Sequence, residues 1–430
     1  MLIEFKVKNF RSIREEQTLS LVATKANKEL PDCIIDKPLK GLAGLQFLKG
    51  AALYGANASG KSNVLLALKY LADLVENSAT ELKPGDTTGT EPFKLDQNCI
   101  TQPSEFEVTF EADNVRYLYG IALTPQRIIE EYLYAYPQGR ENCWCHRSYD
   151  EKAGKYEWDR TAGSFKNDLK LQGYTKENVL FLSQGADLNH QQLTKVYMWF
   201  KTKLRFLNLG ADGGVSPGMT LQRLSDGLKK KQILSLLKSA DFNISDIKVT
   251  EHELDIESIK RKLPPELLSK LMEKGNDSKF STKEINFEHE DRTGSLIPMD
   301  FENEESAGTQ RFFSLLGPWL DTLEEGYTVF IDEIDTSLHP NLVRELLKLL
   351  FCAKNNPNGA QIVFTTHNPV FLDQTLLRRD QIWFTEKNNQ GATFLYPLTD
   401  YKPRDKEAIA KRYLAGVYGG IPYLPEGLKL

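Results

Sequence analysis

The sequence predicts an α/β protein with a parallel sheet, an antiparallel β subdomain and an inserted helical arm. Three observations lead to this fold class. A glycine-rich loop joins an apolar run to a helical pattern at residues 50–74. Apolar runs and helical patterns alternate over residues 327–385, as parallel strands and their crossover helices do. Residues 105–147 instead alternate apolar and polar side chains between turn residues, which predicts an antiparallel meander.

The glycine-rich loop has the spacing G-x-x-x-x-G-K-[ST] and runs from Gly55 to Ser62. Its glycines let backbone N–H groups turn inward, and the following helix adds the positive end of its dipole. Lys61 is placed to reach the β- and γ-phosphates of a nucleotide, and Ser62 to give a hydroxyl to Mg²⁺. A chance glycine turn is the alternative, but a strand before the loop and a helix after it are the context that the motif needs. We expect a nucleotide site that includes Gly55, Asn57, Gly60, Lys61, Ser62 and Asn63.

Two acids end the apolar strand Val329–Glu333. Asp332 is expected to hold nucleotide-bound Mg²⁺, and Glu333, which faces the other way, to orient or deprotonate the attacking water. Acids at strand ends are common on protein surfaces, so this pair alone would be weak evidence for a metal site. It becomes strong evidence because the same chain contains a phosphate loop. His367 ends the next strand, at the sheet edge where ligands bind in open α/β folds, and is expected to contact the γ-phosphate.

A second anion pocket is expected where Ser306 and Gly308 precede an apolar helix. A serine hydroxyl and a glycine amide at the start of a helix both suit an anion. The alternative is a helix cap with no further role.

The remaining elements follow from periodicity. The spacing of apolar residues predicts a mostly helical arm at residues 187–275. The arm contains two basic clusters, Lys229–Lys231 and Lys260–Lys262. These clusters are either solvated helix faces or contacts for a phosphate backbone or a partner. The predicted domains are 1–186, 187–284 and 285–430. Further strands are expected at 2–8, 17–22, 50–54, 178–183, 361–366, 381–385 and 393–396, and helices at 191–206, 221–240, 256–274, 301–323, 340–352 and 369–377.

Composition narrows the class of protein. The 430 residues carry a net charge of −5, which argues against a globally basic nucleic-acid binder but leaves room for a local basic groove. The five cysteines form no C-x-x-C pair, so we expect reduced thiols in a cytoplasmic protein. Cys143-Trp-Cys145-His146 suits ordinary strand residues better than a metal site. No signal-peptide core or 18-residue apolar run occurs, so no membrane contact is expected.

The order of the motifs resembles the ABC-type ATPase heads of the SMC and overcoming-lysogenization-defect group. More narrowly, it is similar to the ATPase subunits of bacterial anti-phage systems such as Septu, PARIS and RloA-like abortive infection. The motifs are Asn-Phe-Arg-Ser, the phosphate loop, Ser-x-Gly-x-Gln, the strand ending in Asp-Glu, Ser-Leu-His-Pro and Thr-His-Asn. The resemblance implies that Ser306 and Gly308 form the signature, that Ser337 to Pro340 form the D-loop, that His367 is the switch histidine and that Arg11 lies near the nucleotide. The signature reads Ser-Ala-Gly-Thr-Gln here, and Gln184 is a weak candidate for the Q-loop.

The resemblance also implies a function. ATP and Mg²⁺ would bind between two copies of the chain, in a homodimer or an oligomer of dimers, and hydrolysis would open them. The chain would then be the sensor subunit of an anti-phage system. It would control a separate effector, expected to be a nuclease, with the arm contacting DNA or a phage protein. An ATP-bound scaffold with negligible turnover and a chromosomal DNA-repair ATPase are the alternatives.

Overall fold

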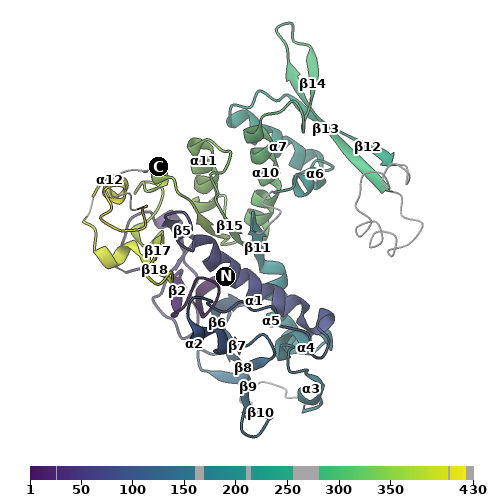
Figure 1. Ribbon diagram of the computed structural model, residues 1–430. Helices are drawn as coiled ribbons and strands as arrows, with labels where there is room; N and C mark the ends of the chain where they lie inside the picture. Colours follow the sequence, from purple (N-terminus) through teal and green to yellow (C-terminus); the bar gives the residue numbers. More distant parts are fainter. Residues whose placement is uncertain (26, 160–168, 210–214, 255–279, 405–406, 423–430) are drawn as a thin grey trace, which may run out of the picture. The chain divides into compact units, whose positions relative to one another are not determined.

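The computed structural model describes the chain except residues 26, 160–168, 210–214, 255–279, 405–406 and 423–430 (Figure 1). The chain divides into two compact units. The first contains residues 1–214, 321–336 and 340–430, and the second contains residues 215–320 and 337–339.

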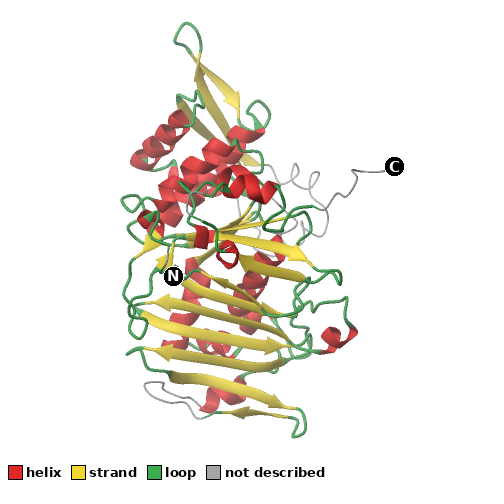
Figure 2. Cartoon of the chain, turned by 90° about the vertical axis from the view of Figure 1, so that its left-hand side faces the viewer, coloured by secondary structure: helices red, strands yellow, loops and turns green. Residues whose placement is uncertain are grey.

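A seven-stranded antiparallel sheet forms one part of the first unit (Figure 2). The predicted meander of residues 105–147 is confirmed, and the two N-terminal strands extend it, so that the order is β10-β9-β8-β7-β6-β1-β2. The strands are β1 (Leu2–Lys8), β2 (Gln17–Ser20), β6 (Ser104–Ala112), β7 (Val115–Leu123), β8 (Ile128–Tyr136), β9 (Asn142–Asp150) and β10 (Lys155–Trp158).

A six-stranded sheet in the order β11-β15-β16-β5-β17-β18 forms the other part. The predicted parallel sheet is confirmed, since every pair is parallel except the edge pair β17–β18. Its strands are β5 (Gly50–Gly55), β11 (Leu204–Leu207), β15 (Thr328–Ile331), β16 (Gln361–Thr365), β17 (Ile382–Lys387) and β18 (Thr393–Pro397). A separate two-stranded sheet pairs β3 (Ile34–Ile35) with β4 (Phe47–Leu48).

Helices cover one face of the antiparallel sheet and lie behind its strands in Figure 2. Helix α1 runs from the phosphate loop across this face, and one buried apolar cluster joins it to β5, β6 and α5. The helices of this unit are α1 (Lys61–Glu81), α2 (Gln97–Thr101), α3 (Leu169–Tyr174), α4 (Phe181–Asp187), α5 (Gln191–Lys203), α11 (Pro340–Phe351) and α12 (Ile409–Leu414), with 3-10 turns η1 (Pro31–Cys33), η2 (Pro369–Phe371), η3 (Arg379–Gln381) and η4 (Leu398–Tyr401).

The second unit combines helices with a small antiparallel sheet in the order β12-β13-β14. Phe287, Phe301 and Phe313 form its aromatic core with ring centroids 5.1 to 5.3 Å apart. Its elements are α6 (Gly218–Arg223), α7 (Gly227–Ser239), β12 (Asp246–Leu254), β13 (Phe280–Glu290), β14 (Leu296–Asp300) and the first part of α10 (Ala307–Glu325), which continues into the first unit.

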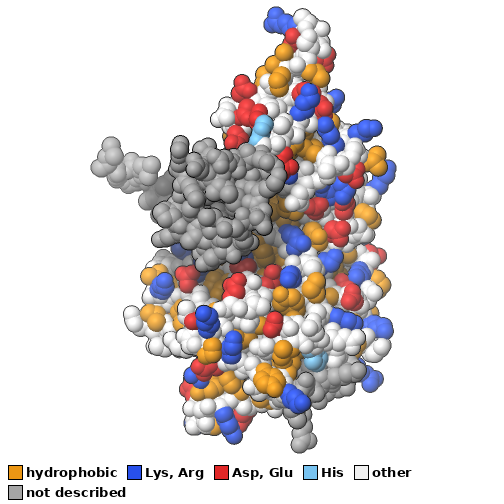
Figure 3. Space-filling model, turned by 90° about the vertical axis from the view of Figure 1, so that its right-hand side faces the viewer, with side chains coloured by type: hydrophobic (Ala, Val, Ile, Leu, Met, Phe, Trp, Pro, Cys, Tyr) orange, Lys and Arg blue, Asp and Glu red, His pale blue; other side chains and the backbone are white. Residues whose placement is uncertain are grey.

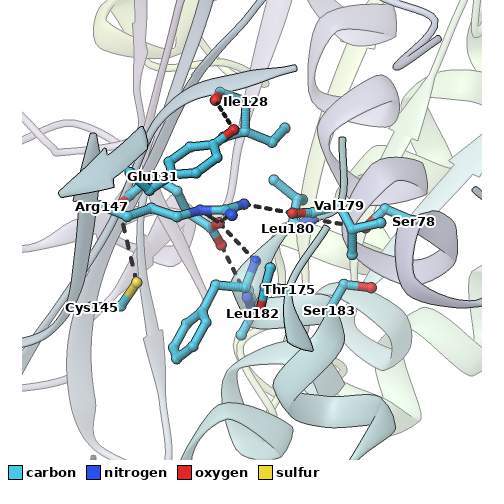
Figure 4. A network of polar contacts seen from close by, with 12 residues as sticks. Ser78, Ile128, Glu131, Cys145, Arg147, Thr175, Val179, Leu180, Leu182 and Ser183 are labelled. Carbon is cyan, nitrogen blue, oxygen red and sulfur yellow. Dashed lines mark hydrogen bonds and ion pairs between the residues drawn. The ribbon is translucent and has the colours of Figure 1, made fainter. Parts of the chain in front are cut away.

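Several local predictions were wrong. The expected strand at 178–183 does not form. Helix α4 begins at Phe181 instead, where the carboxylate of Glu131 accepts the N–H groups of Phe181 and Leu182 at 2.7 and 3.0 Å (Figure 4). The expected helix at 191–206 ends at Lys203, because the next four residues pair with β15 as β11. Only Pro369–Phe371 of the expected helix at 369–377 is helical. Strands β12 and β13 were not foreseen in the helical arm, and the expected helix 256–274, with Lys260–Lys262, lies outside the described residues.

None of the helices in the described part of the chain has the length and apolar composition needed to cross a bilayer.

Candidate functional site

The phosphate loop joins the C-terminal end of β5 to α1, in the strand–loop–helix context that the motif requires. Gly60 has φ 106°, a left-handed conformation that glycine adopts most readily. A Cβ atom there would lie 2.1 Å from Thr393 Oγ1, and one at Gly55 would lie 2.3 Å from Thr385 Oγ1. Both glycines are therefore required by conformation or by close packing.

Lys61 is buried beneath this loop, where its ammonium donates to the carbonyl oxygens of Gly55 and Ala56 at 2.9 and 3.0 Å. Burial lowers the pKa of Lys61 to about 8, although the charges of Asp332, Glu333 and Asp335 act to raise it. Among the described residues no carboxylate forms an ion pair with Lys61. A buried ammonium held by carbonyl oxygens at the start of a helix suits a phosphate ligand.

Thr365, at the end of β16, holds both acids that follow the neighbouring strand β15, which ends at Ile331, earlier than expected. Its hydroxyl donates to Asp332 Oδ1 at 2.5 Å and accepts the Glu333 N–H at 2.8 Å. Glu333 has φ 48°, which is a strained conformation for a residue other than glycine. The hydrogen bond from its N–H therefore helps to keep the backbone in the turn that separates the two carboxylates.

His367 follows two residues after Thr365. Partial burial and the charge of Lys61 lower the pKa of His367, while Glu333, Asp335 and a hydrogen bond to the backbone of Gly55 oppose the shift. The lowered pKa favours the neutral form of the His367 imidazole. This geometry places His367 against the first glycine of the phosphate loop, as expected for a group that contacts phosphate.

Asp335 is a third acid at this edge, and it was not predicted from the sequence. Thr366 Oγ1 donates to Asp335 Oδ1 at 2.8 Å, and the carboxylate acts electrostatically on Lys61 and His367. The signal was present in the sequence: Asp335 lies two residues after Glu333, and Thr366 precedes His367.

The loop after β1 contacts the site through Ser12. Ser12 Oγ accepts from Asn63 Nδ2 at 2.7 Å and shares a 2.8 Å hydrogen bond with Thr393 Oγ1. Arg11 instead forms a 2.8 Å ion pair with Glu91. Ser12 thus ties β1 to the first turn of α1, while the role expected of Arg11 stays a prediction.

The other predicted residues of the loop lie as follows. Asn57 is exposed at its tip, and Ser62 is half-buried at the start of α1. The hydroxyl of Ser62 and the carboxylate of Asp332 are oxygen donors of the kind that Mg²⁺ prefers.

Ser306 and Gly308 belong to the second unit, together with Ser337 of the expected D-loop. Ser306 Oγ accepts the Thr309 N–H at 3.1 Å, so Ser306 caps α10. A Cβ atom at Gly308 would lie 3.2 Å from the carbonyl oxygen of Ser337, so the two segments are in close contact. Ser306 is exposed, which leaves it open to a ligand or partner in addition to its capping role.

Comparisons with known proteins show the family of the chain. Among solved structures, the "SMC head domain from Thermotoga maritima" is similar, with 13% identity, coverage of 92% of this chain and 98% of that chain, and a TM-score of 0.37, which is too low to support a conclusion. None of the curated proteins matches the chain. The family model described as "AAA domain, putative AbiEii toxin, Type IV TA system" matches residues 51–373, which is well over half of the chain. The chain therefore belongs to this family of AAA domains.

Proposed function

We propose that the chain is an ATPase that hydrolyses ATP to ADP and phosphate with Mg²⁺. The observation that carries the proposal is the buried ammonium of Lys61, which has no described ion-pair partner and lies in one compact unit with Asp332, Glu333 and His367. This combination of cation, acids and histidine suits a nucleoside triphosphate and its bound metal.

Each residue has a defined task in this proposal. Lys61 and the loop amides bind the phosphates, and Ser62 and Asp332 would hold Mg²⁺, which neutralises phosphate charge when bound. Glu333 orients the attacking water and takes its proton, since its carboxylate is exposed beside the loop. His367, held beside Gly55 at the phosphate loop, contacts the γ-phosphate as the bond to the leaving group breaks.

We also propose that the chain assembles into a dimer and acts in abortive infection. Ser306 and Gly308 of one copy cover the nucleotide that another copy holds, so ATP closes a symmetric dimer and hydrolysis opens it. The description of the family names a toxin and a type IV toxin–antitoxin system, which supports a role in abortive infection. In that role the chain is a sensor that controls a separate effector, expected to be a nuclease.

The test is phosphate release by the wild type, Glu333→Gln and Lys61→Met, with binding of a fluorescent ATP analogue measured in parallel. We expect Glu333→Gln to bind nucleotide and to turn over at least about 100-fold more slowly, and Lys61→Met to lose binding. Glu345→Gln, an exposed glutamate of α11, is the matched control and should behave as the wild type. Release by Glu333→Gln at the wild-type rate would remove Glu333 as the base. Tight binding by the wild type without release would favour the scaffold alternative.

A DNA contact through the arm is supported less well. Lys230 of the first basic cluster is paired with Asp246 at 2.6 Å. On the face shown in Figure 3, lysine and arginine side chains of the described residues are interspersed with acidic ones rather than gathered in one patch. If the cluster binds DNA, replacing Lys229–Lys231 by glutamine should flatten the salt dependence of binding. An unchanged slope would exclude this cluster.

A further inference from the structure

The C-terminal tail, residues 409–422, packs beside the phosphate loop (yellow in Figure 1). It consists of α12 and a turn in which Gly416, Gly419 and Gly420 have φ between 66° and 78°. Among these glycines, Gly419 has no room for a side chain, because a Cβ atom would lie 2.5 Å from the Tyr396 hydroxyl oxygen. No role for this segment follows from its sequence.

The first contact of the tail is with the strand that enters the phosphate loop. The ring of Tyr413 lies edge-on to Tyr54 at 5.6 Å and stacks on Phe384 at 5.5 Å. Tyr413 is 4% exposed and donates its hydroxyl to the carbonyl oxygen of Gly420 at 3.2 Å. A Cβ atom on Gly420 would lie 3.6 Å from the Cα atom of Gly55. The tail therefore touches the first glycine of the loop and the tyrosine before it.

The second contact is with the segment that follows His367. Helix α12 packs against η2, which begins two residues after His367. Beyond η2, Gln374 Nε2 donates to the carbonyl oxygen of Glu407 at 2.5 Å, and the Glu407 carboxylate accepts a hydrogen bond from the Tyr418 hydroxyl. The tail is thus fastened to both segments that meet at Gly55.

We propose that this tail is a positioning element of the nucleotide site, with Tyr413 as its principal residue; the inference rests on the proposed nucleotide binding. Gly55 supplies the carbonyl that holds Lys61, and its backbone hydrogen-bonds His367. The tail fixes Gly55 on one side and the His367 segment on the other. Without the Tyr413 ring, Tyr54 and Phe384 lose their packing partner beside the phosphate loop, and the loop no longer holds the geometry that phosphate requires.

The experiment measures the dissociation constant of a fluorescent ATP analogue with Mg²⁺ for full-length variants. We expect Tyr413→Ala to bind roughly tenfold more weakly or worse, since small displacements of binding groups are costly. Tyr413→Phe keeps the ring contacts and should bind within about threefold of the wild type. Tyr117→Ala removes an equally exposed tyrosine, also 4%, from β7 of the same unit and serves as the matched control for lost packing.

The outcomes separate the two proposals. Wild-type affinity in folded Tyr413→Ala would overturn the positioning role while leaving the proposed function intact. Equal losses in Tyr413→Ala and Tyr117→Ala would show general destabilisation and would also overturn it. If the wild type binds no nucleotide, the proposed function fails, and the positioning role fails with it. Because the experiment measures nucleotide binding and not hydrolysis, it tests the positioning role even if the wild type hydrolyses ATP at a negligible rate.

Discussion

At the scale of single residues, the site depends on one hydroxyl group shared between two strands. Thr365 is buried, donates to Asp332 and accepts from the backbone of Glu333, so the proposed metal ligand and the proposed base share one anchor. A methyl group in place of this hydroxyl removes both hydrogen bonds and leaves a strained Glu333 backbone without its partner.

Thr365→Val is therefore expected to slow phosphate release by about 10- to 100-fold, because the acids lose their fixed positions. The measurement is steady-state turnover, alongside thermal unfolding. Thr328→Val is the control, since Thr328 is also buried and hydrogen-bonds Gln361 at the opposite end of β15. Equal turnover in the two variants would contradict the shared-anchor interpretation.

The buried ammonium of Lys61 predicts a pH dependence of stability. The pKa of Lys61 is about 8 in the folded chain and near 10.5 when solvated, so the unfolded chain binds more protons between these values. Stability of the nucleotide-free protein should therefore rise with pH from 8 toward 10.5, relative to Lys61→Met. Urea midpoints of both proteins at pH 7.5 and 9.5 give this difference. A difference that stays constant with pH would contradict the lowered pKa.

Tyr54 offers a test of polar burial at the same loop. Its hydroxyl is fully buried and has no hydrogen-bond partner among the described residues. Tyr54→Phe should keep nucleotide affinity and leave the free energy of unfolding unchanged or higher by up to about 1 kcal/mol. Chemical denaturation measures this change, and a loss of more than about 1 kcal/mol would indicate that the hydroxyl has a partner in solution.

At the scale of elements, a buried ion pair determines where α4 begins (Figure 4). The carboxylate of Glu131 receives the N–H groups of Phe181 and Leu182, the Tyr119 hydroxyl and the guanidinium of Arg147, whose nearest nitrogen lies at 2.8 Å. Glu131 and Arg147 are each 1% exposed. The antiparallel sheet is thereby joined to the helix that carries Gln184.

Glu131→Gln is expected to destabilise the fold by about 3 to 5 kcal/mol, because it leaves the guanidinium of Arg147 buried without its counter-charge. Urea unfolding measures the loss. Glu130→Gln, the adjacent glutamate whose side chain is 41% exposed, should change stability by less than about 1 kcal/mol. Similar effects of both substitutions would mean that the buried pair has no special part in stability.

Local periodicity was enough to predict many of these elements. The phosphate loop, the meander and the strands of the parallel sheet other than β11 are each encoded by residues close together in the chain. Helix α4 could not be predicted in this way, because its cap comes from Glu131, some fifty residues earlier. The same holds for β11, which pairs with β15 more than a hundred residues away, and for Thr365, whose partners lie on the neighbouring strand.

At the scale of the whole molecule, the proposed chemistry is divided between the two compact units. The first unit contains Lys61, Asp332, Glu333 and His367, and the second contains Ser306 and Gly308. Under the proposed function, the ATP site of one copy is complete only when the second unit of another copy covers the nucleotide bound to its first unit. Nucleotide then controls association, which is the property that a sensor of an effector needs.

The most direct test of this central proposal is the mass of Glu333→Gln in solution, measured by light scattering with and without ATP and Mg²⁺. The chain has a mass of 48.9 kDa, so the account predicts a shift from one protomer to two when ATP binds. Glu333→Gln combined with Ser306→Arg should bind ATP and stay a single protomer. A Glu333→Gln protein that binds ATP and remains at 48.9 kDa would contradict the account.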